Sequence, residues 1–209
     1  MKRIIGILCM LMGIVLVMSA FSLILMNRQE DQRAENHVAE IIPMLREEIS
    51  RTHQNASAEQ IIPQDNIPEE LLKPEDLIMT EKNINGYAYI GYLTIPDLNL
   101  ELPIMAGWDS RRLQISPCRF TGTLRGEDLV IMAHNYTSHF GRLSKLSEGS
   151  KIQFMDMDGK LWDYSVAAMD ILPAEAVEEM TAGEYDLTLF TCAPNRTHRI
   201  TVRCNFTES

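Results

Sequence analysis

A cysteine at the end of a predicted strand is the side chain best suited to covalent chemistry. The stretch 185–191 is rich in β-branched and aromatic residues, which predicts a strand leading directly into Cys192. Pro194 cannot continue a central ladder, so a loop follows the cysteine. A second strand pattern over 199–206 brings the guanidinium of Arg199 back to the same rim. Because free cysteine is among the most buried residue types, Cys192 is interpreted either as a packed thiol or as a nucleophile facing a groove.

The residues around Cys192 resemble a family signature. Thr188-Leu189-Phe190-Thr191-Cys192 is similar to the TLxTC motif of sortases, the cysteine transpeptidases of Gram-positive cell surfaces. In that family a His precedes the Cys and an Arg follows it on the next strand, which corresponds to His134 and Arg199 here. The stretch 91–96, Gly-Tyr-Leu-Thr-Ile-Pro, also resembles the first barrel strand of sortases. The resemblance covers about residues 86–206 and implies the catalytic set Cys192, His134 and Arg199.

These three side chains have complementary chemistry. The thiolate is the nucleophile, and a neighbouring cation lowers the thiol pKa from about 8.5. Arg199 stays charged and donates from a fixed fork, so it is suited to hold the substrate carbonyl or the oxyanion that forms when Cys192 attacks. Proton transfer falls to His134. We therefore expect two-step covalent catalysis, in which His134 protonates the leaving amine and then deprotonates the incoming one.

Neighbouring residues offer alternatives. Thr191 is a candidate for contacting the substrate or Arg199, or simply a strand residue. His139, in a predicted loop, is expected to line the substrate groove or to be solvated. His198 should point to the strand face opposite Arg199 and lie at the surface. Arg196 could replace Arg199, but the pattern His-Arg-Ile-Thr-Val fits the arginine strand of the family better.

No metal site is predicted, because the histidines and cysteines lack the close paired spacings of zinc ligands. Some sortases bind calcium through loop acids, so calcium stays an option without assigned ligands, and no other cofactor is expected. The available acids are Glu127, Asp156, Asp158 and Glu184. Cys118 and Cys204 are predicted to be buried free thiols, with a disulfide outside the cell as the alternative.

The N-terminal segment predicts a membrane anchor. Residues 4–26 carry no charge, and about 20 apolar residues span a bilayer as a helix. The apolar run is longer than the core of a signal peptide, which favours an uncleaved signal anchor. Lys2 and Arg3 precede it, so the positive-inside rule puts the N-terminus in the cytoplasm and the rest outside. The net charge of −10, without a basic patch, argues against a nucleic-acid partner.

Three regions follow from this pattern. Residues 1–26 form the cytoplasmic tip and transmembrane anchor, 27–82 an acidic extracellular stalk, and 83–209 the catalytic domain. The stalk begins with helically spaced apolar positions over 38–49, which either pack on the chain's own domain or bind a partner. Pro43 is expected to kink or divide that helix. Three prolines over 55–82 indicate a partly extended linker.

The fold class is mostly β. Strands are predicted over 87–95, 100–105, 128–134, 151–157, 160–169, 185–191 and 199–206, and short helices over 109–115, 140–146 and 173–180. Seven or eight short strands in this length favour a closed barrel or sandwich. The resemblance narrows this to a closed sortase-type β-barrel of seven to eight strands with short helices, preceded by a transmembrane helix and a partly helical stalk.

The resemblance also implies an activity and partners. Sortases cleave an LPxTG-like C-terminal sorting signal of secreted proteins and transfer the acyl group to an amine of a peptidoglycan precursor or a pilin lysine. Pilin-polymerising sortases usually have a lid with an Asp-Pro-aromatic motif and a second membrane span. Neither occurs in the sequence, which favours an anchoring enzyme at the cell membrane. The alternatives are a pilin-polymerising sortase, a cysteine hydrolase that uses water, and a tethered binding module without activity.

Overall fold

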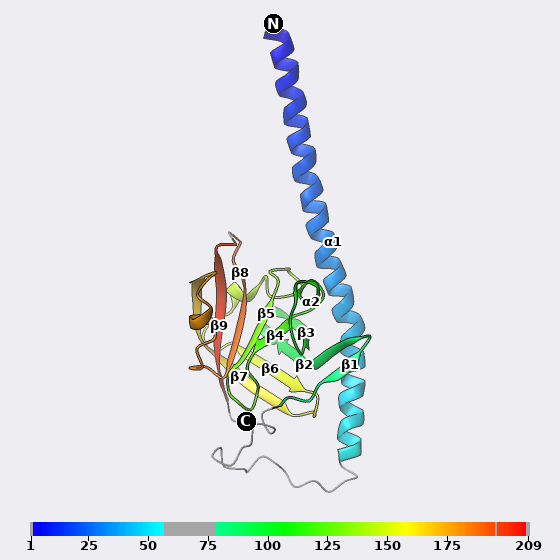
Figure 1. Cartoon of the computed structure of the whole chain (residues 1–209), viewed down its shortest axis with the longest axis vertical. Coiled ribbons are helices and arrows are strands. Elements are labelled where there is room, and N and C mark those ends of the chain that lie inside the picture. Colours follow the sequence, from blue (N-terminus) through cyan, green and yellow to red (C-terminus); the bar gives the residue numbers. More distant parts are fainter. Residues whose placement is uncertain (1, 57–77, 195, 208–209) are drawn as a thin grey trace.

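The computed structural model describes residues 2–56, 78–194 and 196–207. It consists of one long helix lying against a β-barrel (Figure 1). Helix α1 spans Lys2–Ala56 and continues across the boundary predicted at residue 26. Pro43 lies inside the helix and does not divide it, because the packed residues on either side hold the backbone helical. The proline-containing stretch 57–77 lies outside the described residues.

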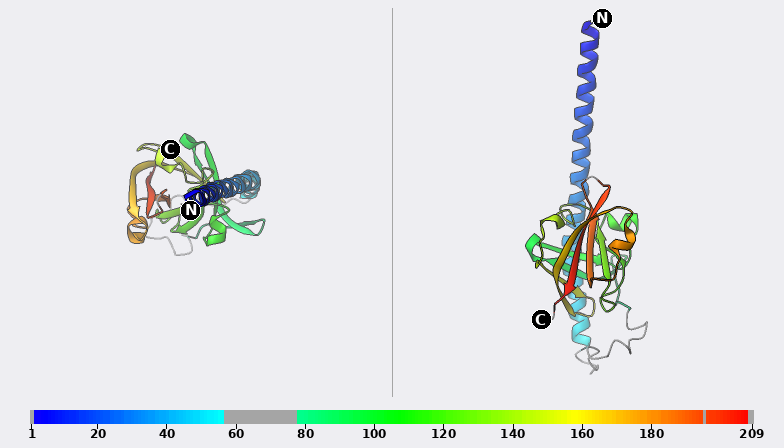
Figure 2. Two further views of the ribbon diagram at one scale, coloured as in Figure 1. Left: turned by 90° about the horizontal axis from the view of Figure 1, so that it is seen from above. Right: turned by 90° about the vertical axis from the view of Figure 1, so that its left-hand side faces the viewer.

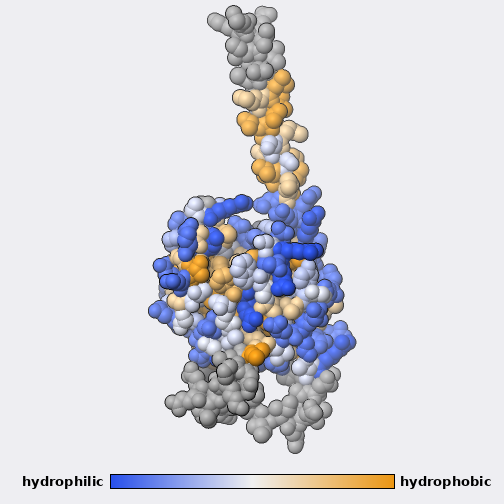
Figure 3. Space-filling view, in the orientation of Figure 1, coloured by the Kyte–Doolittle hydropathy of each residue, from blue (hydrophilic) through white to orange (hydrophobic). Residues whose placement is uncertain are grey.

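The N-terminal half of α1 projects beyond the barrel (Figures 1 and 2). Within Met10–Thr52 it contains an 18-residue window of mean hydropathy 2.2, none of which is buried. Its exposed apolar surface is visible above the domain (Figure 3). Among the described residues this is the one helix long and apolar enough to cross a bilayer. Its length and composition are compatible with the predicted single-pass anchor.

Nine strands form one sheet in the described residues. They are β1 Lys82–Ile84, β2 Tyr87–Ile95, β3 Leu100–Met105, β4 Cys118–Thr121, β5 Leu129–Ala133, β6 Lys151–Asp156, β7 Leu161–Pro173, β8 Leu187–Cys192 and β9 His198–Phe206. The order is β1-β2-β3-β4-β5-β8-β9-β7-β6, and pairing of β2 with β6 closes β2 to β9 into an eight-stranded barrel. Two pairs, β3–β4 and β5–β8, are parallel. The predicted closed sortase-type barrel is confirmed.

A glycine allows the closure. A bulge between Tyr89 and Gly91 shifts the register of β2 against β3, and Gly91 has a φ of 145°. A Cβ atom there would lie 2.0 Å from the carbonyl oxygen of Met155 on β6. Only glycine lets β2 approach both neighbours closely at this corner.

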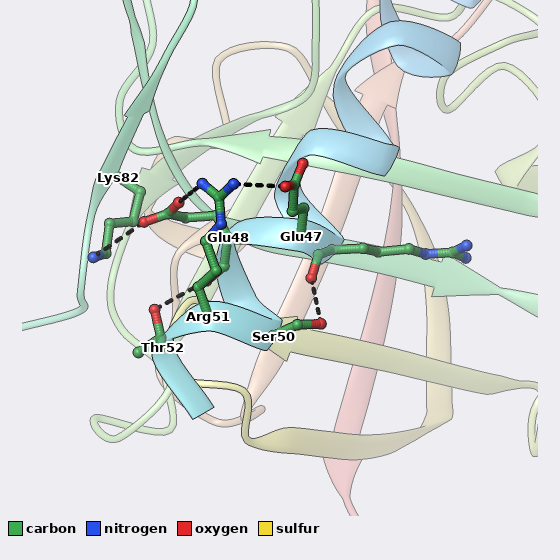
Figure 4. A network of polar contacts seen from close by, with 7 residues as sticks. Glu47, Glu48, Ser50, Arg51, Thr52 and Lys82 are labelled. Atoms are coloured by element: carbon green, nitrogen blue, oxygen red, sulfur yellow. Dashed lines mark hydrogen bonds and ion pairs between the residues drawn. The ribbon is translucent and has the colours of Figure 1, made fainter. Parts of the chain in front are cut away.

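Helix α1 packs on the barrel through the apolar stripe of the stalk. Ile41 and Leu45 are fully buried, and Ile42 and Ile49 nearly so, against Tyr89 and other residues of the sheet. Polar contacts flank this stripe. Glu48 pairs with Lys82 of β1 at 3.5 Å, Arg51 bonds Glu47 at 2.6 Å (Figure 4), and Arg46 forms a bidentate pair with Glu101 at 2.6 and 2.8 Å. The stripe thus packs on the chain's own domain.

The smaller elements differ from the expected ones in extent. The turn after β2 is the short 3₁₀ helix η4, Pro96–Leu98. The helix predicted over 109–115 is α2, Ser110–Leu113, and the side chain of Asp109 caps its N-terminus. The helix predicted over 140–146 is only η5, Leu143–Lys145, and that over 173–180 is α3, Val177–Met180. Strands β1 and β4 were not predicted, because three- and four-residue strands carry too little alternation to be recognised.

Candidate active site

The parallel pairing of β5 and β8 brings two predicted site residues to one edge of the sheet. Ala133 and Thr191 are partners in the register, and His134 and Cys192 directly follow them. Thr191 is 1% exposed, and its Oγ1 donates a 2.8 Å hydrogen bond to the carbonyl oxygen of Ala133. The two strand ends are therefore tied together one residue before the imidazole and the thiol.

The antiparallel pairing of β8 and β9 adds the arginine. Cys192 and Arg199 are directly opposed in the register, so their side chains leave the sheet on the same face. Both are half-buried. Arg199 Nη1 donates to the carbonyl oxygen of His198 at 3.2 Å and to that of Arg196 at 3.5 Å, which keeps the guanidinium near the β8–β9 connection.

This face points away from the barrel interior. Leu189 and Val202 lie in the central core, so the alternate positions Cys192 and Arg199 point outward. His198 lies on the face of β9 opposite to Arg199, as expected from the alternation of side chains. It is half-buried, with Nδ1 2.9 Å from Thr197 Oγ1.

Aromatic side chains continue the outer face away from Cys192. Phe190, two residues before the cysteine, meets Phe120 of β4 edge to face at 5.5 Å, and Trp108 stacks on Phe120 at 5.6 Å. Trp108 is 47% exposed, and it lines a surface depression of about 390 Å³ together with Arg119 and Phe120. The sequence did not reveal this surface, because β4 was not recognised as a strand.

His134 lies between charges of opposite sign. Burial of the ring lowers the pKa of His134 below its ordinary value of 6.5. The carboxylate of Glu30 on α1 opposes that shift, and the guanidinium of Arg196 adds to it. Arg196 is exposed and has a left-handed φ of 59°. Arg196 therefore acts on the field around His134, whereas Arg199 is the arginine registered with Cys192.

His139 is fully buried, which differs from the expectation of a groove-lining or solvated side chain. Its ring packs against Tyr136 at a centroid distance of 5.5 Å. Burial lowers the pKa of His139 to about 4. The next residue, Phe140, is packed in the core. His139 is therefore buried beneath the loop and contributes no surface to a groove in this conformation.

A second arginine on this face, Arg203, was not predicted from the sequence. Arg203 is 4% exposed and forms an ion pair with Asp170 of β7 at 3.3 Å. It donates to the carbonyl oxygens of Glu179 and Met180 in α3, and to Thr188 Oγ1 at 3.2 Å. Arg203 therefore links α3 to β8 and β9 on the same outer face as Cys192. Its place on the outward-facing alternation of β9, four residues after Arg199, is the signal that could have identified it.

The two other thiols considered from the sequence are buried, and Asp156 has a structural role. Cys118 and Cys204 are buried and free, and burial raises the pKa of each thiol to about 12. Asp156 accepts hydrogen bonds from Trp162 Nε1 and from the backbone of Lys160, which fixes the β6–β7 turn. The part of the chain that the structure describes contains no group of three or more His, Cys, Asp or Glu side chains able to hold a metal.

The family model "Sortase domain" matches residues 93–207, more than half of the chain. The chain belongs to the sortase family. Sortase A of Streptococcus agalactiae is 25% identical over 155 residues, which cover 66% of this chain and 61% of that protein. This sortase thus spans less than two thirds of the length of that curated relative.

Solved sortase structures share the barrel. Sortase C from Streptococcus pneumoniae matches with a TM-score of 0.58 at 24% identity, covering 81% of this chain and 97% of the other. Sortase C from Clostridium perfringens, solved with the C-terminal cell wall sorting motif, matches with a TM-score of 0.53 at 24% identity, covering 81% and 91%. These likenesses show that this sortase has the fold of cell-wall and pilin sortases.

Proposed function

We propose that this sortase is a membrane-anchored cysteine transpeptidase that cleaves an LPxTG-like sorting signal and transfers the acyl group to an amine. The observation that supports this most strongly is the strand register. His134 and Cys192 directly follow Ala133 and Thr191, which are partners in the pairing of β5 and β8. Cys192 is in turn opposed by Arg199 on the outer face of the sheet. A nucleophile, a proton carrier and a fixed cation are the parts that acyl transfer requires.

The proposed reaction has two balanced steps. The Cys192 thiolate attacks the carbonyl carbon of the scissile amide, and the carbon–nitrogen bond breaks as His134 gives its proton to the leaving amine. A thioester on Cys192 remains. An incoming amine then attacks the thioester and loses a proton to His134, and the thiolate leaves. The Arg199 guanidinium donates to the carbonyl oxygen as negative charge develops on it in both steps.

The site faces the anchor. The β8–β9 connection lies at the end of the barrel that points toward the N-terminal half of α1 (Figure 1). Glu30 follows the apolar segment by four residues, which is about 6 Å of helix. We therefore place the catalytic rim close to the outer surface of the cell membrane, with Lys2 and Arg3 on the cytoplasmic side. A sorting signal still held in the bilayer would present its scissile bond at this level.

The remaining part of the proposal is the identity of the amine that accepts the acyl group. The pneumococcal relative is described in terms of pilin substrate specificity, and the streptococcal sortase A stands for the cell-wall group. We propose an amine of a peptidoglycan precursor as the acceptor, because the sequence contains no Asp-Pro dipeptide of the kind found in the lid of pilin-polymerising sortases. A pilin lysine is the alternative acceptor, and water is the acceptor if the enzyme is a hydrolase.

Product analysis tests this proposal. The full chain in detergent micelles is incubated with LPxTG-like peptides, with no amine, with a short peptidoglycan-type amine, or with a lysine-containing pilin peptide. We expect an amine-linked product whose yield is highest with the peptidoglycan-type amine, and none with Cys192→Ala. Free acid as the sole product in all arms would establish a hydrolase. Intact peptide in all arms would contradict the proposed enzyme activity.

A further inference from the structure

The anchoring helix reaches the loop that carries His134. Asp31 of α1 accepts hydrogen bonds at Oδ1 from the Ser138 backbone N–H at 2.9 Å and from Ser138 Oγ at 2.6 Å. One residue earlier on α1, Glu30 accepts a bond from the Tyr136 hydroxyl at 3.3 Å. These bonds join residues more than 100 positions apart in the sequence.

The loop itself is compact, so a contact at Tyr136 and Ser138 is transmitted to His134. The N–H groups of His139 and Gly141 both donate to the Tyr136 carbonyl oxygen, and the Phe140 N–H donates to that of His134 at 3.2 Å. Gly141 is required for this turn, because a Cβ atom there would lie 2.5 Å from the carbonyl oxygen of Asn135. These bonds tie the loop into one turn between Phe140, which is buried in the core, and α1.

The contact with α1 is polar and borders an open groove. A groove of about 350 Å³ separates the helix from the barrel here, and Asp31, Glu35 and Ser138 line it. Apolar packing of α1 is concentrated further along the helix, at Ile41 and Leu45. The bonds of Glu30 and Asp31 thus supply much of what holds the helix to the loop at this point.

The ring of Tyr136 links these bonds to the imidazole. It lies 5.0 Å from the His134 ring and 5.5 Å from the His139 ring, centroid to centroid. The charged groups that act on His134 are Glu30 from α1 and Arg196 from the β8–β9 connection. The aromatic contact fixes the imidazole from one side, while the carboxylate of Glu30 favours its protonated form.

We propose that Glu30 and Asp31 are positioning residues of the active centre, which hold the His134 loop through Tyr136 and Ser138 and make the membrane-anchoring helix part of the catalytic site. This inference rests on the proposed role of His134. It means that a soluble barrel without α1 would keep Cys192 but lose the support of the imidazole.

The test compares single substitutions in the full chain in detergent micelles. Asp31→Ala removes the carboxylate that accepts both loop bonds, and Ser138→Ala removes the hydroxyl bond while the backbone N–H bond stays. The double variant asks whether the two substitutions act through the same contact. Glu30→Gln removes one charge beside His134. Glu47→Gln is the matched control, because Glu47 lies exposed on the same helix and pairs with Arg51 of α1. Steady-state kinetics, pH profiles and nuclear magnetic resonance of the His134 ring are measured for each variant.

We expect Asp31→Ala to lower kcat about tenfold with little change in KM, because a misplaced general acid slows the chemical step. Ser138→Ala should lower kcat less, since the backbone N–H bond to Asp31 remains, and the double variant should be no worse than Asp31→Ala. Glu30→Gln should lower the pKa of His134 in the ring titration and shift the limb of the kcat/KM profile that His134 controls to lower pH. Glu47→Gln should match the unsubstituted chain in every measurement.

Three results would overturn the inference: kinetics of Asp31→Ala indistinguishable from Glu47→Gln, additive losses in the double variant, or a His134 titration that Glu30→Gln leaves unchanged. If Asp31→Ala does not fold, Tyr136→Phe removes the loop's hydrogen bond to Glu30 by deleting one oxygen and should lower kcat in the same way. The ring titration needs no substrate, so it decides the inference even if no transferase product forms, and failure of the proposed function is recognised separately.

Discussion

Thr191 Oγ1 donates a 2.8 Å hydrogen bond to the carbonyl oxygen of Ala133, and both residues immediately precede a proposed catalytic side chain. The hydroxyl is buried and points toward the neighbouring strand rather than into the groove. Thr191 is therefore better described as a residue that positions His134 relative to Cys192 than as one that contacts substrate.

Replacing Thr191 by Val should reveal this role. The variant keeps the side-chain shape and leaves the Ala133 carbonyl without its partner, which should cost about 1 kcal/mol of unfolding free energy. We expect kcat to fall about tenfold while the peptide KM changes little, because the alignment of the two strand ends is loosened. Thr191→Ser retains the hydroxyl and should restore most of kcat. An unchanged kcat in Thr191→Val, which keeps a methyl group and loses only the hydroxyl, would contradict the positioning role of the bond.

The two arginines near the site should differ sharply in their response to lysine. Arg199→Lys keeps the charge but loses the fork opposite Cys192, and we expect kcat/KM to fall about 100-fold. Arg196→Lys keeps the charge near His134 at an exposed position, and a fall of less than about threefold is expected. The comparison is made by initial-rate kinetics with one peptide and one amine. The reverse order of effects would transfer the oxyanion role to Arg196.

The sequence predicted the parts of this site that depend on strand ends. Cys192 and Arg199 were recognisable because Pro194 marks a loop between two strand patterns, and the register then opposes them. His134 required the family resemblance, because nothing local shows that β5 pairs with β8. The fate of His139 was not predictable, since a loop sequence does not reveal that Phe140 draws its neighbour under the surface.

The contact of α1 with the loop that carries His134 was not predictable from the sequence, for a different reason. Glu30 and Asp31 look like ordinary charges after a membrane span, and only the tertiary packing of Ile41 and Leu45 brings them against the loop at 136–138. Similarly, the outward alternation of β9 places Arg203 on the same face as Arg199, but only the structure shows that α3 covers its side chain.

Protonation of His139 should destabilise the protein in acid. Burial lowers its pKa to about 4 in the folded state, against 6.5 ordinarily, so the unfolded chain binds more protons between these values. The free energy of unfolding should therefore fall as the pH drops from 6.5 toward 4, by up to about 3 kcal/mol from this residue. Denaturant titrations of the unsubstituted chain and of His139→Gln at several pH values isolate the contribution as a difference. Parallel pH curves for the two proteins would exclude it.

Arg203 should stabilise the packing of α3 on β8 and β9. Arg203→Met removes the ion pair with Asp170 and leaves the carbonyl oxygens of α3 without their donor, which should cost about 3 kcal/mol of unfolding free energy. Arg111→Ala removes an exposed guanidinium from α2 and should change stability by less than about 0.5 kcal/mol. Both are measured by denaturant unfolding. Equal stability of Arg203→Met and the unsubstituted chain would show that the buried contacts around Arg203 contribute little.

The most direct test of the central claim is the intact mass of the full chain after brief incubation with an LPxTG-like peptide and no amine. The account predicts a mass increase equal to the acyl fragment, located on Cys192 by fragmentation, discharged by added amine and lacking in Cys192→Ala. It also predicts that His134→Ala forms the adduct far more slowly, because the leaving amine lacks its proton donor. Absence of any adduct while peptide is consumed, or an adduct that persists in Cys192→Ala, would contradict it.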